Sequence, residues 1–160
     1  MRTLMLAAAA LLITATPAVA AEKVTRNGVG DVEVGASYRS LRDAGLVGKT
    51  QPGCELEGPG RRVAPLKAPL RGFAQLDRQR RVEGVYVTRG ATARGVGVGD
   101  RLRKLRRAYD TVRVDRSTEE TFGIALATIP RSSGGRIQFA IGAKNGRVQG
   151  IGVPIIPFCE

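Results

Sequence analysis

The feature of this sequence that most constrains its fold is an internal similarity. The segment VEVGASYRSLRDAG at 32–45 aligns with VGVGDRLRKLRRAY at 96–109. Further along, FAQLDRQRRVEGVYV at 73–87 aligns with FAIGAKNGRVQGIGV at 139–153. Two similar segments in the same order indicate a tandem duplication. We therefore predict one repeat at about 28–90 and a second at about 94–158.

Each repeat is expected to open with a short helix. An extended lead-in ends at a glycine, Gly35 or Gly99, and apolar residues then recur at helical spacing. Ser37 and Asp100 have side chains that can cap such helices by accepting a hydrogen bond from a free backbone N–H. The apolar positions are Tyr38, Leu41 and Ala44 in the first repeat and Leu102, Leu105 and Tyr109 in the second.

The rest of each repeat has the pattern of strands separated by turn residues. Asn145-Gly146 is a dipeptide favoured in tight hairpins, and 77–80 is the matching turn of the first repeat. The sequence thus predicts an α+β fold, in which two helix-plus-antiparallel-strand repeats form one domain with a shared or stacked sheet. The expected strands are 61–66, 71–76 and 81–88, then 122–130, 135–143 and 146–156.

This arrangement resembles the beta-lactamase-inhibitor-protein-like superfamily and its single-repeat relatives, the small outer-membrane lipoproteins of the assembly machinery. The resemblance implies a concave antiparallel sheet backed by helices, used for binding proteins and not for catalysis. Two departures stand out: Arg101 replaces the expected hydroxyl in the second repeat, and tryptophan is absent. The matching residues are Gly35, Ser37 and Leu41, with Gly99 and Leu105 in the second repeat.

The first twenty residues have the pattern of a secretory signal peptide. Arg2 precedes the apolar run 4–13, and Ala18-Val19-Ala20 provides an A-x-A cleavage site. The apolar run is shorter than the roughly 18 residues of a membrane span. We expect cleavage after Ala20, which leaves an exported single domain at 21–160 without a transmembrane segment.

Cys54 and Cys159 are the only cysteines. Export makes a disulfide between them plausible, and closing so long a loop would stabilise the fold by roughly 4 to 5 kcal/mol in the chain-entropy model. Two buried free thiols or an intermolecular bridge are the alternatives. Thiol catalysis has little support because the chain has no histidine to activate a thiolate.

The chain is strongly basic, with 26 lysines and arginines against 14 acidic residues and a net charge of +12. Such a balance favours acidic partners, although arginine enrichment is also what the coding bias of a high-GC genome produces. The second predicted helix concentrates this charge, against the small cost of like charges on one short helix. Either a polyanion site or compositional drift explains it. The candidate polyanion-binding residues are Arg101, Arg103, Lys104, Arg106, Arg107, Arg113 and Arg116.

Enzyme signatures are largely missing. Without histidine, the common catalytic triads and the zinc helix cannot form. The glycines at 95, 97 and 99 lack the final glycine of a dinucleotide fingerprint, because Asp100 stands there. Glu55 and Glu57 would share a strand face, which is more often a pair of solvated carboxylates than a glycosidase site. We expect no catalytic residues, cofactor or metal.

The expected function is an exported, non-enzymatic binding protein of the cell envelope or medium that binds a protein through a sheet face. The alternative is an envelope polyanion binder that uses the basic helix at 101–107. Specific nucleic-acid recognition is disfavoured, because single-strand binding needs stacking aromatics and only Tyr109 lies near the charge.

Overall fold

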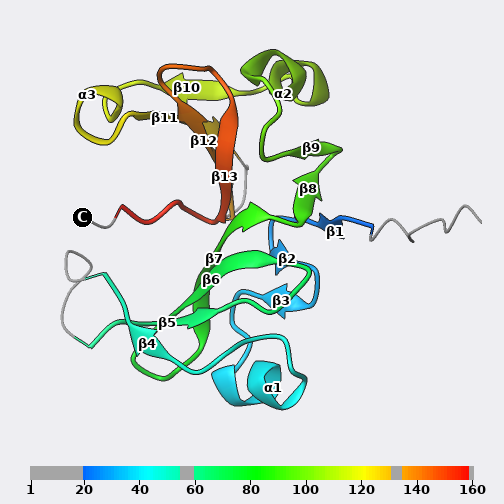
Figure 1. The fold of residues 1–160 in the computed structure, drawn as a ribbon, viewed down its shortest axis with the longest axis vertical. Coiled ribbons are helices and arrows are strands. Elements are labelled where there is room, and N and C mark those ends of the chain that lie inside the picture. The colour runs from blue at the N-terminus through cyan, green and yellow to red at the C-terminus, as the bar shows by residue number, and fades with distance from the viewer. Residues whose placement is uncertain (1–19, 55–59, 131–134, 159–160) are drawn as a thin grey trace, which may run out of the picture.

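The structure is a computed structural model that describes residues 20–54, 60–130 and 135–158. Its main element is an eight-stranded sheet in which every neighbouring pair is antiparallel (Figure 1). In spatial order its strands are β10 (Arg113–Asp115), β11 (Ile124–Ile129), β12 (Ile137–Gly142), β13 (Val148–Val153), β7 (Val82–Arg89), β6 (Arg71–Leu76), β5 (Arg62–Pro65) and β4 (Gln51–Pro52).

Smaller elements accompany this sheet. The hairpin of β2 (Gly28–Val29) and β3 (Val32–Glu33) forms a two-stranded sheet. A three-stranded sheet contains β1 (Glu22–Lys23), β8 (Ala91–Ala93) and β9 (Val96–Gly97). The helices are α1 (Tyr38–Asp43), α2 (Leu102–Ala108) and α3 (Glu119–Phe122).

The predicted α+β class is wrong, because the fold is mostly β. Strands make up 45% of the structure and helices 13%. The helices at 38–43 and 102–108 do form, but they are six and seven residues long and each buries one leucine, Leu41 or Leu105. Helices this short cannot form a layer of their own, since most helical stability comes from a packed face. The fold is therefore not a pair of helix-plus-strand repeats.

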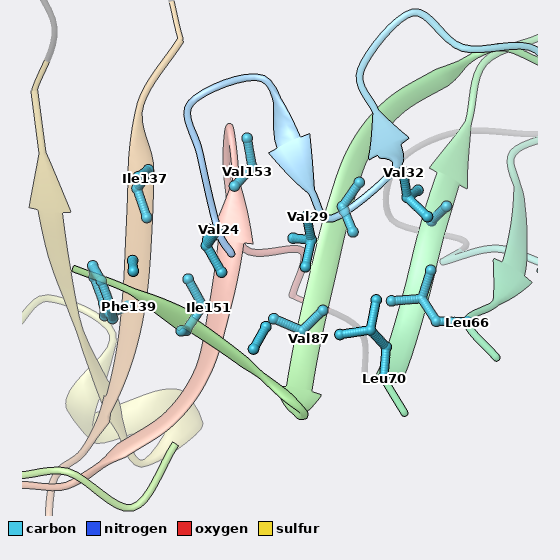
Figure 2. Close-up of a cluster of buried hydrophobic side chains, with 14 of the residues drawn as sticks. Val24, Val29, Val32, Leu66, Leu70, Val87, Ile137, Phe139, Ile151 and Val153 are labelled. Atoms are coloured by element: carbon cyan, nitrogen blue, oxygen red, sulfur yellow. The ribbon is translucent and has the colours of Figure 1, made fainter. Parts of the chain in front are cut away.

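The hydrophobic core lies on one face of the large sheet. Residues on neighbouring strands that face each other point to the same side, so Val87, Ile151 and Phe139 form a buried row across β7, β13 and β12. Val29 and Val32 of the β2–β3 hairpin pack over this face (Figure 2). The core therefore joins strands that come from both similar halves of the sequence.

The opposite face carries a row of side chains with different chemistry, which we name the second-face row. It runs directly across seven strands, and its register follows from the strand pairs. Its members, in order, are Pro65, Phe73, Tyr86, Gly152, Gln138, Thr128 and Arg113.

The C-terminal tail, 154–158, turns back over the middle of this row. The Ile156 N–H donates to Oε1 of Gln138 at 2.9 Å, and the Gln138 amide donates to the Thr128 hydroxyl at 3.1 Å. The backbone and side chain of the tail fill the space where a Cβ on Gly152 would lie. Gly152 is therefore required where the tail crosses the sheet.

The similar sequence segments make the same local contacts, and we call aligned residues counterparts. The peptide N–H of Gly35 donates to the Val82 carbonyl at 2.7 Å, and that of Gly99 donates to the Val148 carbonyl at 2.8 Å. Two further hydrogen bonds occur in both halves. The Tyr38 N–H donates to the Arg80 carbonyl, as the Leu102 N–H does to the Gly146 carbonyl. The Arg81 guanidinium donates to the Gly35 carbonyl, as that of Arg147 does to the Gly99 carbonyl. The duplication and its limits at 28–90 and 94–158 remain predictions.

The two helix caps differ. Ser37 is the N-cap of α1 and accepts from the Ser40 N–H at 3.1 Å, as expected. The expected cap by Asp100 is wrong, because α2 begins after Arg101, which makes no side-chain cap. The Asp100 carboxylate instead accepts from the Gly97 N–H at 2.9 Å and from Lys104 at 2.8 Å.

The strand expected at 122–130 is shorter than predicted. A single helical turn, α3, takes its first residue, and Gly123 ends this turn with a φ of 68°. Glycine adopts this left-handed backbone without a steric cost. The remaining expected strands lie within three residues of the observed ones at each end.

Candidate functional site

An aromatic pair occupies one part of the second-face row. The rings of Phe73 on β6 and Tyr86 on β7 lie 5.5 Å apart between centroids and are inclined at 52°. Both residues are half-buried. Aromatic pairs in such tilted arrangements are favourable and keep their side chains in fixed positions. This face therefore presents a preformed apolar contact with a polar tip.

Tyr86 is held in place by a glycine on the neighbouring strand. Its ring and hydroxyl occupy the space where a Cβ on Gly150 would lie. Burial raises the pKa of the Tyr86 hydroxyl above its usual value, so the hydroxyl stays protonated and can donate. Within the described residues it makes no hydrogen bond, which leaves its donor and acceptor free for a partner.

Other apolar and charged side chains form pairs near the tail and on β7. Ile155 of the tail is exposed, and the rings of Phe122 and Phe158 lie 4.6 Å apart where the tail approaches α3. The guanidinium of Arg61 pairs with the carboxylate of Glu83 on β7. The second-face row itself combines the aromatic pair with polar side chains and, at one end, Arg113, and such a mixture of apolar and polar groups is typical of protein interfaces.

The predicted polyanion-binding residues all lie exposed at one end of the molecule, where Figure 1 shows α2 and β10. Two of them are neutralised: Lys104 pairs with Asp100 at 2.8 Å, and Arg116 with Glu119 at 2.7 Å. In the described part of the chain, the remaining five make no ion pair. They are Arg101 before α2, Arg103, Arg106 and Arg107 on α2, and Arg113 on β10.

The backbone of the glycine-rich turn before α2 excludes a phosphate cradle. The N–H of Gly97 donates to Asp100 and that of Gly99 to the Val148 carbonyl. The Gly97 hydrogen bond, together with Lys104, lowers the pKa of the Asp100 carboxyl, so it is negative at neutral pH. These donors are taken, and a carboxylate stands beside them.

Cys54 is buried, and its Sγ lies 3.1 Å from the carbonyl oxygen of Phe158. Cys159 lies outside the described residues, so the disulfide stays a prediction. The contact nevertheless brings Cys54 next to the residue that precedes Cys159. Glu55 and Glu57 also lie outside the described residues. Among those that are described, no three His, Cys, Asp or Glu side chains gather as metal ligands.

Comparison with known proteins adds no relative to this description. The chain matches no protein-family model, no curated protein and no solved structure. Over the described ranges, no helix has the length and apolar character to span a membrane.

The sequence alone did not predict the aromatic pair of Phe73 and Tyr86. Phe73 and Tyr86 belong to strands that were predicted correctly, but their pairing depends on the register between β6 and β7. The only local signal was that Tyr86 stands between two valines on a predicted strand, so its side chain points away from theirs. In the structure Val85 and Val87 are buried and Tyr86 is half-buried.

Proposed function

We propose that this chain is an exported, non-enzymatic binding protein that holds another protein against the second face of its sheet. The observation that carries the proposal is Tyr86, a half-exposed aromatic that packs at a tilt against Phe73 and over Gly150, with a hydroxyl that makes no hydrogen bond among the described residues. Tyrosine is enriched among the residues that contribute most to binding, because it offers a large rigid surface and a polar tip.

Preorganisation favours this surface over the rest of the molecule. The aromatic pair, the Gln138 to Thr128 hydrogen bond and the tail contact already fix the second face before a partner arrives. A partner therefore loses little free energy in ordering these side chains. We expect truncation of Tyr86 to weaken binding by about 2 kcal/mol, which is roughly thirtyfold in Kd.

A comparative capture experiment tests the proposal. The purified protein is coupled to beads and exposed to the envelope and medium fractions of its own host. Tyr86→Ser removes the phenol ring, while a helix variant with Arg103→Gln and Arg106→Gln serves as the matched surface control. The proposal predicts a protein that the wild type and the helix variant retain and that Tyr86→Ser loses.

Each result bears on the proposal directly. A captured protein that Tyr86→Ser retains as well as the wild type contradicts binding through the second face. Circular dichroism and thermal melting of Tyr86→Ser show whether the variant is folded. A photo-crosslinking residue in place of Phe73 gives an independent measurement, because it must form an adduct with the same captured protein.

Export and the disulfide belong to the same proposal and have their own tests. Protein recovered from the envelope or medium should begin at Ala21, and recovery only from the cytoplasm with Met1 in place would contradict export. Thiol titration of the unfolded, unreduced protein should find no free thiol. Two free thiols would show that Cys54 and Cys159 are not joined.

A polyanion-binding role is the second candidate, and the five unpaired arginines around α2 and β10 favour it. Arginines that neutralise a polyanion release its counterions, so binding falls steeply with salt. Replacing Arg103, Arg106 and Arg107 with glutamine should abolish retention on heparin at physiological ionic strength. Unchanged retention would mean that net charge alone, and not this cluster, attracts polyanions.

A further inference from the structure

A hollow of about 330 Å³ lies beside α1, on a different element from the predicted basic helix. Three arginines line it: Arg39 and Arg42 from α1, and Arg80 from the turn before β7. The side chain of Tyr38 also lines it, and Asp43 contributes one carboxylate. This volume lies within the range of small-molecule sites in proteins.

Arg80 has an unusual backbone for its residue type. Its φ is 58°, in the left-handed region, and its counterpart Gly146 has a φ of 61°. The carbonyl of each residue also accepts an equivalent hydrogen bond, from the Tyr38 N–H to Arg80 and from the Leu102 N–H to Gly146. The turn therefore needs a left-handed residue, which glycine supplies without strain and arginine does not. An arginine at a strained position points to a role for its side chain.

A second left-handed arginine shows what a structural role looks like. Arg94 has a φ of 48°, while Gly30, at the equivalent place in the β2–β3 hairpin, has a φ of 53°. The Arg94 guanidinium donates to the Ala108 carbonyl at 3.3 Å and lies 4.9 Å from the centre of the Tyr109 ring. These two contacts account for its presence.

Arg80 has much weaker contacts. Its guanidinium lies 6.0 Å from the centre of the Tyr38 ring, at the outer limit of a cation–π contact. The Arg80 guanidinium makes no hydrogen bond and no ion pair with any described residue. Its side chain is exposed at the edge of the hollow. Its donors are therefore available to a ligand, and the backbone strain has no comparable structural explanation.

The other groups of the hollow are partly fixed. The Tyr38 hydroxyl donates to the Gly48 carbonyl at 3.2 Å and accepts from Arg42 at 3.0 Å, which orients both side chains. Arg39 lies 3.9 Å from Asp43, and both are largely exposed, so this pair neutralises little charge. A flat aromatic surface thus lies between cations on two different elements.

We infer that this hollow binds a small ligand that carries a phosphate group on a planar ring. Arginine forks match phosphate oxygens in geometry and charge, and a ring can stack against Tyr38. The equivalent place beside α2 lacks both the aromatic ring and the guanidinium, because Leu102 replaces Tyr38 and Gly146 replaces Arg80. The site therefore depends on residues that distinguish α1 from α2, and not on contacts that the fold requires.

Phenyl phosphate is the probe for this site, with inorganic phosphate and phenol as its separate parts. Amide chemical shifts are followed by NMR during titration of the full chain. We expect phenyl phosphate to move the amides at 37–43 and 79–80 and to bind at least tenfold more tightly than either part. Arg80→Gly and Arg42→Gln should each weaken this binding at least tenfold.

The controls separate binding from folding. Arg106→Gln changes the counterpart of Arg42 on α2 and should leave the titration unchanged. Arg80→Gly introduces the residue that the equivalent turn already uses, so it removes the guanidinium without disturbing the turn. Absence of shifts at 37–43, or equal affinity in wild type and Arg80→Gly, would overturn the inference. An affinity for inorganic phosphate equal to that for phenyl phosphate would also overturn it, because the ring would then contribute nothing.

Discussion

The helices α1 and α2 make matching backbone contacts with the sheet, yet their side chains differ. Each buries one leucine, and each is preceded by a glycine whose N–H donates to a carbonyl at the start of a long strand. Around α1 there is a serine cap, a tyrosine and a hollow. Around α2 and β10 there is an uncapped helix start and five arginines that form no ion pair with any described residue. The shared contacts position the helices, and the differing side chains are where function can reside.

This difference also separates two kinds of positive charge. The arginines of α2 are spread over a solvated helix, where a polyanion would be held by charge alone and lost at high salt. Arg42 and Arg80 approach Tyr38 and, together with Arg39, line a hollow, where shape adds to charge. A net charge of +12 therefore describes two surfaces with different expected ligands.

The largest expected effect tests whether α1 and α2 contribute equally to the free energy of unfolding. Leu41 is 4% exposed and Leu105 is 0% exposed. Replacing either with alanine should lower the free energy of unfolding by about 2 to 5 kcal/mol, because a buried leucine leaves a cavity. Chemical denaturation measures both. A loss below about 1 kcal/mol for only one of them would break the equivalence.

A smaller effect concerns the caps. Ser37→Ala should cost about 1 kcal/mol, since the Ser40 N–H loses its acceptor. Arg101→Ser places a hydroxyl at the counterpart position and should gain about 0.5 to 1 kcal/mol, because it adds a cap and removes a cation from the positive end of the helix. Thermal melting compares the two variants. A gain from Ser37→Ala or a loss from Arg101→Ser would contradict this account.

Arg80→Gly should stabilise the protein slightly. Removing a left-handed arginine relieves about 1 kcal/mol of strain, and the added freedom of glycine in the unfolded chain offsets roughly half of it. We expect the midpoint of urea unfolding to rise with an unchanged slope. A lower midpoint would show that the contact of Arg80 with Tyr38 stabilises the fold more than the strain destabilises it.

The smallest effect is a pH dependence that only the α2 side should show. The Gly97 N–H and Lys104 depress the pKa of Asp100 in the folded state. A depressed folded pKa means that this stabilisation is present above the ordinary aspartate value of about 3.9 and is lost as pH falls through the lower folded value. Ala36, its counterpart before α1, has nothing to titrate.

Asp100→Asn tests this dependence. Unfolding free energies at about pH 6 should be lower in the variant than in the wild type, and the two should converge once the pH lies below the depressed folded pKa, where the carboxyl is protonated in both states. Ala36→Asn is the matched control on the other side. A constant difference between wild type and Asp100→Asn across this range would show that charge is not the cause.

Local pattern was enough to place most elements. The strand β6 begins and ends at the expected residues, 71 and 76, and β7 is displaced by only one residue at each end. Alternating side chains and turn residues act within a few positions of each other, so they can be recognised along the chain. The Ser37 cap follows for the same reason. Asp100 has the same capping chemistry, but α2 starts one residue later and its carboxylate takes other donors.

The balance of the fold could not be judged in this way. Recognising two helical stripes led to an α+β class, whereas each stripe spans fewer than two turns and most of the buried core residues lie on strands. How much a helix contributes depends on what it packs against, which periodicity does not contain.

By itself, the amino-acid sequence determined the positions of the turns, most strands and both leucine-anchored helices, together with the concentration of arginine at 101–107. Only the tertiary structure decided that Phe73 and Tyr86 pack together on the second face of the sheet, that Lys104 and Arg116 are neutralised, and that Arg80 lines a hollow beside α1. The physical reason is range: backbone propensity acts between neighbours, whereas strand register and side-chain pairing join residues far apart in the chain.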